Sequence, residues 1–234
     1  MPRLELTARA FVTDLMSRRS EQEQRKIARY FKGGDGTEII GVRMKETFDL
    51  AKRCTDMPLE QVERLLSSPY YEARMGAVSI LDFKARKPSV GPEGRRSLYE
   101  LYLRRHDRIN NWDLVDRSAP RVIGWYLLDR SRDPLFDLAT SADIWHRRTA
   151  IVATFWFIRQ GDVDDALKIA EILLHDDEEL INKPVGTALR EVSKIDEAKL
   201  VTFVQEHVTT MPRVTLRYAV EKLSPERRTE LLSR

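Results

Sequence analysis

The residues best suited to chemistry in this sequence lie in the segment Asn-Asn-Trp-Asp-Leu-Val-Asp, residues 110–116. An asparagine is a good helix N-cap, because its side-chain oxygen accepts a hydrogen bond from an N–H of the first turn. We therefore expect Asn111 to begin a helix. Trp112 and Asp116 are four residues apart and project from one face of that helix. An aromatic ring beside a carboxylate attracts a cation, so the spacing predicts a site for a positively charged group.

Simpler interpretations of these side chains stay open. A tryptophan is more often highly buried than exposed, and Asp116 could form a salt bridge with Arg117 or Arg121. Two further tryptophans, Trp125 and Trp156, lie in runs that are apolar on all sides. A helix of that kind is usually buried, so we expect both of these tryptophans in the core.

The elements that must position these residues are helices. Apolar residues recur at helical spacing along the chain, and convincing alternating strands are absent. The predicted helical segments are 3–30, 43–54, 57–66, 68–83, 93–104, 111–130, 132–140, 142–159, 162–174, 177–193, 196–208, 212–222 and 225–232. The glycine-rich segment Gly33–Gly36 ends the first of these helical segments. It lacks the spacing of a phosphate-binding loop. Paired helices with short connectors predict one all-α, solenoid-like domain over residues 1–234, with an ordinary helical bundle as the alternative.

Composition limits the class of protein. The chain of 234 residues has 40 Lys and Arg against 37 Asp and Glu, a net charge of +3 that does not by itself imply nucleic acid. Its single cysteine, Cys54, excludes an intramolecular disulfide, and its four histidines lack metal-ligand spacing. No apolar run is long enough to span a membrane, and residues 1–5 do not resemble a signal peptide. We expect a soluble cytoplasmic protein.

The run Asn-Trp-Asp-Leu-Val-Asp, residues 111–116, also resembles the signature of the AlkD-like DNA alkylation repair family. Similar blocks follow the order found in that family at 71–77 with 83–84, at 144–152 and at 182–191. The resemblance covers nearly the whole chain. It implies HEAT-like helical repeats with a concave DNA-binding face, and a DNA glycosylase that acts as a monomer on duplex DNA containing alkylated purines. It also implies cleavage that needs no metal or other cofactor and that does not flip the damaged base into a deep pocket.

Residue roles follow from the same resemblance. Asp116 matches the catalytic carboxylate, and Trp112 matches the aromatic residue that lines the DNA-facing cleft. Trp145 and Arg148 share a face of a helix for which Ser141 is the expected cap. Arg148 matches a phosphate contact near the lesion, with Arg147 as the alternative register. An arginine suits this role because its guanidinium offers a fork of N–H donors.

The block at 182–191 contains a departure from the family pattern. The best-known members carry a tryptophan directly after the glycine of this block, where this chain has Thr187. Arg190 matches the family, and we expect it to contact the DNA backbone together with Arg43 and Arg213. Because threonine has no ring, Thr187 favours an alternative function: a non-catalytic member that binds distorted or branched DNA. A helical-repeat scaffold without nucleic acid is the third interpretation.

Overall fold

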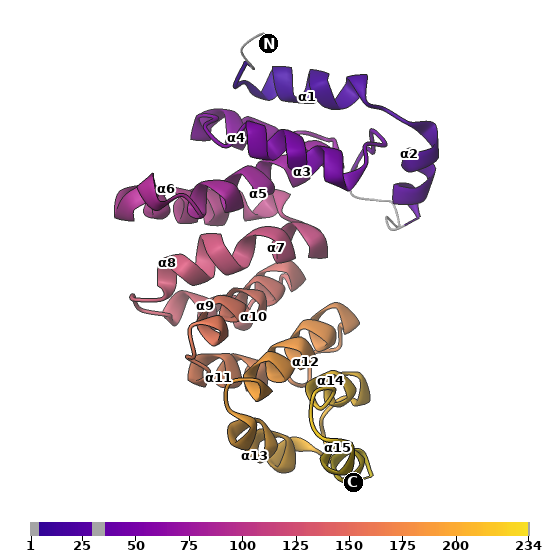
Figure 1. Ribbon diagram of the computed structural model, residues 1–234, viewed down its shortest axis with the longest axis vertical. Coiled ribbons are helices and arrows are strands. Elements are labelled where there is room, and N and C mark those ends of the chain that lie inside the picture. Colours follow the sequence, from indigo (N-terminus) through magenta and orange to yellow (C-terminus); the bar gives the residue numbers. More distant parts are fainter. Residues whose placement is uncertain (1–4, 30–35, 234) are drawn as a thin grey trace. The chain divides into compact units, whose positions relative to one another are not determined.

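A computed structural model describes residues 5–29 and 36–233 of the protein. Its fold is all-α and built from packed helices, as the sequence predicted (Figure 1). In the described residues, extended pairing is limited to an isolated bridge between Glu38 and Tyr70. The predicted break at Gly33–Gly36 lies outside these residues except for Gly36. The chain divides into two compact units, Met1–Asn110 and Asn111–Arg234. The single domain over the whole chain stays a prediction.

The first unit contains six α-helices within the described residues. They are α1 (Ala8–Ser17), α2 (Glu21–Ala28), α3 (Met44–Arg53), α4 (Leu59–Leu66), α5 (Tyr71–Ala85) and α6 (Gly91–Arg104). The predicted first helical region is in fact two helices. They separate because the side chain of Ser20 caps α2, accepting a hydrogen bond from the backbone N–H of Glu23.

Helix α5 is the centre of the first unit. It packs against α1, α3, α4 and α6, and every residue from Tyr71 to Asp82 is buried. A helix surrounded in this way must satisfy its polar side chains internally. Arg74, only 2% exposed, donates to the side chains of Asn110 at 2.6 Å and Thr37 at 2.5 Å. Asn110, the last residue of the first unit, is thus held by a buried arginine.

Glu72 fixes the loop that leads into α3. This fully buried carboxylate accepts the backbone N–H groups of Ile40, Gly41 and Val42 at 2.8 to 3.2 Å. Gly41 has a φ of +94°, and an added Cβ would lie 2.4 Å from the carbonyl oxygen of Ser20. Glycine is therefore required at this position, both for its backbone conformation and for the close approach. The loop delivers Arg43 to the start of α3.

The second unit contains the remaining helices. They are α7 (Trp112–Ala119), a π-helical turn (Pro120–Gly124), α8 (Trp125–Leu127), α9 (Asp133–Ala139), α10 (Ile144–Arg159), α11 (Asp164–Ile172), α12 (Glu179–Ser193), α13 (Glu197–His207), α14 (Arg213–Ala219) and α15 (Pro225–Leu232). Each lies within the bounds predicted from the sequence. Among the described residues, neither unit has a helix that could span a lipid bilayer.

Helices of the second unit form two rows. Helix α10 packs against α7 on one side and α12 on the other, and α12 packs in turn against α14 (Figure 1). Helices α9, α11 and α13 cover this row from one flank, because α9 and α11 contact α10, and α11 and α13 contact α12. Paired helices stacked on their neighbours are a helical-repeat arrangement. Assignment of the repeats to the HEAT class stays a prediction.

Pro120 shapes the helical segment that begins at Trp112. Proline has no N–H, so the carbonyl of Asp116 cannot receive the usual bond from residue 120. The backbone responds with the π-helical turn Pro120–Gly124 before α8 resumes the α-helix. At the end of this turn, Gly124 lies against α10, where an added Cβ would be 2.2 Å from the carbonyl oxygen of Ala153. The glycine allows the two segments to pack closely.

Candidate functional site

Asn111 caps α7, as the sequence predicted. Its side-chain oxygen accepts the backbone N–H of Trp112 at 2.7 Å. Leu114 and Val115 are fully buried and anchor the helix in the second unit. Trp112, the first helical residue, is 43% exposed, and Asp116 follows one turn later with its side chain 38% exposed. An indole ring and a carboxylate are thus presented to solvent by a helix whose other face is fixed.

Arg148 of α10 holds the carboxylate of Asp116 at both oxygens. Its Nε donates to Oδ1 at 2.9 Å, and its Nη2 donates to Oδ2 at 2.8 Å. Arg148 itself is only 6% exposed, and its Nη1 donates to the backbone carbonyl of Leu180. All three guanidinium nitrogens of Arg148, which a phosphate would need as donors, are therefore already bonded to acceptors within the protein. The phosphate contact predicted for Arg148 stays a prediction, and the geometry favours a positioning role.

Arg147 points to a different carboxylate. Its Nε and Nη2 donate to the two oxygens of Asp176 at 2.6 and 3.3 Å. Its Nη1 donates to the carbonyls of Ser141 and Ala142 at 3.0 and 2.9 Å. The two adjacent arginines therefore serve different acceptors, and it is Arg148 that lies beside Asp116. Arg147 thus links α10 to the residues just before α10, Ser141 and Ala142, and to Asp176 in the segment before α12.

The expected cap of α10 was wrong by two residues. The N-cap is Asp143, whose carboxylate accepts the backbone N–H of Trp145 at 2.7 Å. Ser141 instead accepts the N–H of Asp143 at 3.2 Å and lies 3.0 Å from Nδ1 of His146. A carboxylate is favoured at this end of a helix because the helix dipole is positive there.

Helix α12 contains a proline at an interior position, Pro184. Gly186, two residues further, allows α12 to approach α14, because an added Cβ would lie 2.6 Å from the Cβ of Tyr218. Thr187 follows and is partly exposed. Its hydroxyl donates to the carbonyl of Lys183 at 3.0 Å, a bond within its own helix. At this position the chain offers no aromatic ring.

Arg190 is engaged by Glu221. Its Nη1 donates to the carboxylate of Glu221 at 2.6 Å, and its Nε lies 3.5 Å from the carboxylate of Glu191. The ammonium of Lys222 and the guanidinium of Arg190 lower the pKa of Glu221 to about 2. A phosphate that binds Arg190 must therefore compete with this glutamate.

Arg213 begins α14, and both of its Nη atoms donate to the carbonyl of Leu232 at 3.2 and 3.1 Å. The guanidinium thus satisfies the C-terminal end of α15. Two other arginines, Arg217 and Arg228, are exposed and have no ion pair within the described part of the chain. They line a pocket of about 390 Å³ together with Val214, Tyr218, Glu221 and Leu232.

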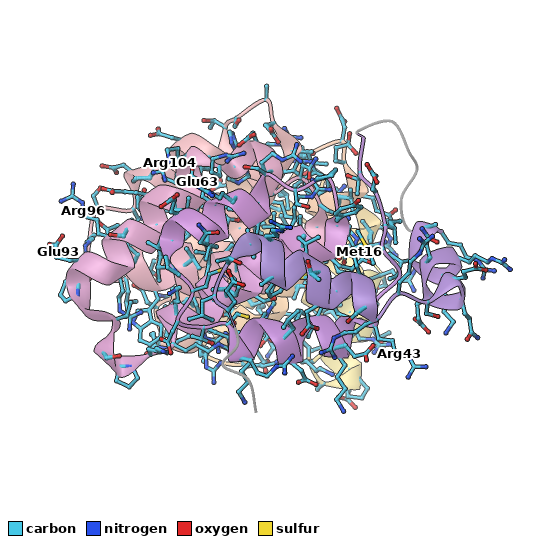
Figure 2. All side chains as sticks on the ribbon, turned by 90° about the horizontal axis from the view of Figure 1, so that it is seen from above. Met16, Arg43, Glu63, Glu93, Arg96 and Arg104 are labelled. Carbon is cyan, nitrogen blue, oxygen red and sulfur yellow. The ribbon has the colours of Figure 1, made fainter. Side chains whose placement is uncertain are left out.

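Arg43 belongs to the first unit, where it directly precedes α3. Its side chain is 71% exposed, and its Nε lies 3.8 Å from Glu23. Figure 2 shows the side chain extending outward from the ribbon. Because the guanidinium is exposed and the separation is long, this ion pair contributes little to stability. Its guanidinium is therefore accessible to another partner.

Trp125 and Trp156 are not core residues of the kind predicted. Both are partly exposed, and they stack on each other with ring centroids 4.5 Å apart and planes at 20°. The guanidinium of Arg121 lies 5.3 Å from the Trp156 ring. Because the indole is large, a tryptophan is rarely buried completely even where most of it is packed.

Within the described residues, neither the cysteine nor a cluster of potential metal ligands forms a second site. Cys54 is buried, and burial raises the pKa of its thiol to about 11, so the nucleophilic thiolate is scarce at neutral pH. In the part of the chain that the structure describes, no group of three His, Cys, Asp or Glu side chains is arranged to hold a metal ion.

Sequence reasoning missed the partners that fix the arginines. Asp176, Glu221 and the carbonyl of Leu180 lie 29, 31 and 32 residues from the arginines that they bind. Of these three partners, only the Leu180 carbonyl could have been found from a local pattern. Pro184 lies inside a predicted helix, and a proline there leaves the carbonyl four residues earlier without its helical donor.

Comparison with known proteins identifies the family. Residues 11–223 match the model of the family described as DNA alkylation repair enzyme. The chain belongs to this family. A solved structure, described as a predicted DNA alkylation repair enzyme from Enterococcus faecalis, has the same fold. Its TM-score is 0.67 at 16% identity, over 89% of this chain and 98% of the other. No curated protein sequence matches this chain.

Proposed function

We propose that this protein is a DNA glycosylase that hydrolyses the N-glycosidic bond of cationic N3- or N7-alkylated purines in duplex DNA. The observation that carries the proposal is the carboxylate of Asp116, which is fixed at both oxygens and still 38% exposed. Trp112, a residue that is 43% exposed, lies on the same helix four residues earlier. Family membership supports a repair enzyme that acts on DNA.

The chemistry explains why a carboxylate and an aromatic face are needed. An N7-alkylpurine carries a positive charge, so breaking the bond from C1′ to the base releases a neutral base and leaves an oxocarbenium-like sugar. Asp116 stabilises the developing charge on that sugar and accepts a hydrogen bond from the attacking water. The water adds to C1′ and loses its proton to solvent. Trp112 contacts the sugar and the cationic nucleotide through its ring face.

Arg148 has a defined task in this mechanism. A single carboxylate on an exposed helix would sample several rotamers, and each would hold the charge at a different place. Two parallel N–H···O bonds restrict the carboxylate to one plane. They also neutralise part of its charge, which lowers its affinity for any nearby cation. The ion pair therefore weakens the electric field of the Asp116 carboxylate but fixes its orientation.

The best candidates for contacts with the DNA backbone are exposed arginines that lack a strong partner inside the protein. Arg217 and Arg228 are exposed and free of ion pairs in the described residues, and they line one pocket. Arg43 has only a weak partner at 3.8 Å. Arg190 and Arg213 already bind internal acceptors. We therefore rank Arg217, Arg228 and Arg43 ahead of Arg190 and Arg213 as phosphate contacts.

The test is base release from duplexes that contain N7-methylguanine or N3-methyladenine. Free base is measured under single-turnover conditions and compared with the spontaneous rate without protein, because these lesions also depurinate unaided. Release well above the spontaneous rate supports the glycosylase. Release at the spontaneous rate, with retained DNA binding, rejects it.

A second function is favoured by Thr187. Its hydroxyl is bonded within α12, and no ring is available at the position where the resembled enzymes have one. A non-catalytic protein that binds distorted or branched DNA needs no aromatic clamp on a lesion. Equal affinity for damaged and undamaged duplexes, higher affinity for branched DNA and no base release would establish this alternative.

A further inference from the structure

Pro184 lies inside α12, six residues into a helix of 15, where proline is strongly disfavoured. It lacks the N–H that would donate to the carbonyl of residue 180, and its ring crowds that carbonyl. Pro184 is buried, and Leu180 is 37% exposed. The consequence is one backbone acceptor, the Leu180 carbonyl, that the helix itself cannot satisfy.

Arg148 supplies the missing donor. Its Nη1 donates to the Leu180 carbonyl, while its Nε and Nη2 hold the two oxygens of Asp116. A guanidinium is planar, so fixing one edge by a backbone group restricts the direction in which the other edge points. The carbonyl belongs to a helix that packs directly against α10, so the anchor is rigid.

We propose that Pro184 is a positioning residue for Asp116. By removing the helical donor of the Leu180 carbonyl, it makes that carbonyl an anchor for Arg148, which in turn sets the plane of the Asp116 carboxylate. The role of Asp116 in base release rests on the proposed function. The geometric link between Pro184 and Arg148 does not, and it is tested separately.

The first measurement uses the unmodified protein and needs no activity. The side-chain N–H signals of Arg148 are followed by NMR with hydrogen exchange, and the exposed Arg217 in the same sample is the comparison. We expect resolved Nη signals for Arg148, with exchange at least tenfold slower than for Arg217. Equal exchange rates for the two guanidinium groups would overturn the proposal.

The second measurement uses Pro184→Ala, which restores an N–H to compete for the Leu180 carbonyl. We expect faster exchange at Arg148, while the midpoint of denaturation stays the same or rises, because alanine is a far better helix former than proline. Pro225→Ala is the matched control. Pro225 is the first residue of α15, where a missing N–H has no helical acceptor. Unchanged Arg148 signals in Pro184→Ala would reject the link.

The third measurement separates positioning from a general structural role. Pro184→Ala should lower the single-turnover rate of base release about tenfold and leave DNA affinity unchanged. In an Arg148→Lys background the same change should have no further effect, because a lysine lacks the fork that transmits the anchor. An equal loss in both backgrounds overturns the proposal. If the unmodified protein releases no base, the proposed function fails, and the exchange measurements still decide the role of Pro184.

Discussion

Arg148 and Asp116 form a two-point ion pair in which the partners differ in exposure. The guanidinium is 6% exposed, while the side chain of the carboxylate that it holds is 38% exposed. The distances of 2.9 and 2.8 Å join separate nitrogens to separate oxygens. One partner is therefore a fixed part of the interior, and the other is a fixed group at the surface. This relationship makes the role of each residue separable by experiment.

Asp116→Asn should reduce the rate of base release and hardly change DNA affinity. The amide keeps the size of the carboxylate but removes the charge that stabilises the sugar cation. Losing one preorganised electrostatic group typically costs a factor of roughly 10² to 10³ in rate. The measurement is single-turnover release of N7-methylguanine, with the spontaneous rate subtracted.

The same substitution also affects stability, because buried Arg148 loses its anionic partner. We expect a decrease of about 1–3 kcal/mol in the free energy of unfolding. Asp137→Asn, at an exposed position of α9, is the control for a lost surface carboxylate. Identical base release by Asp116→Asn and the unmodified protein would remove Asp116 from the site.

Thr187→Trp should raise the excision of small methylated purines. The position is partly exposed, and the present hydroxyl bonds only within α12, so a ring can extend from the helix without displacing the core. Thr187→Leu is the control, because it adds apolar bulk without an aromatic face. A gain specific to tryptophan supports contact with a cationic nucleotide, whereas equal effects of both substitutions would argue against it.

The double variant Arg217→Ala and Arg228→Ala should weaken binding to undamaged duplex DNA. If each arginine contacts one phosphate, the slope of log affinity against log salt should decrease in magnitude by roughly 1.8. The control is Arg64→Ala with Arg96→Ala, which removes the same charge from arginines already paired within their own helices. Similar slopes for the two double variants would mean that the pocket lined by Arg217 and Arg228 does not contact phosphate.

Glu221→Gln should make stability less sensitive to acid. Lys222 and Arg190 lower the pKa of Glu221 from its ordinary value of 4.5 to about 2 in the folded protein. Between these values the unfolded chain binds a proton and the folded protein does not, so stability falls as the pH falls. Above pH 4.5 the contribution is complete, and below about 2 it is gone.

Urea unfolding at several pH values from 6 to 2 measures this contribution. The unmodified protein should lose stability more steeply below pH 4.5 than Glu221→Gln does. Glu206→Gln is the control, because Glu206 is exposed and has no ion pair within the described residues. The two variants should differ in slope. Parallel curves for all three proteins would show that the Glu221 contacts do not persist in solution.

The sequence by itself determined the local features of the site. Capping by Asn111 and the spacing of Trp112 and Asp116 depend only on residues within two helical turns. For the same reason, the helices of the second unit lie within the predicted bounds. The all-α class also follows from apolar periodicity, which each segment carries on its own.

Only the tertiary structure decided which partner each arginine has. Arg147 and Arg148 are adjacent and identical in type, yet one binds Asp176 and the other binds Asp116. The choice depends on how α10 packs between α7 and α12, and no pattern within α10 contains that information. The anchor at Leu180 arises in the same way: Pro184 fixes locally which carbonyl is free, and helix packing brings Arg148 to it. Local chemistry thus supplied the groups, and non-local packing paired them.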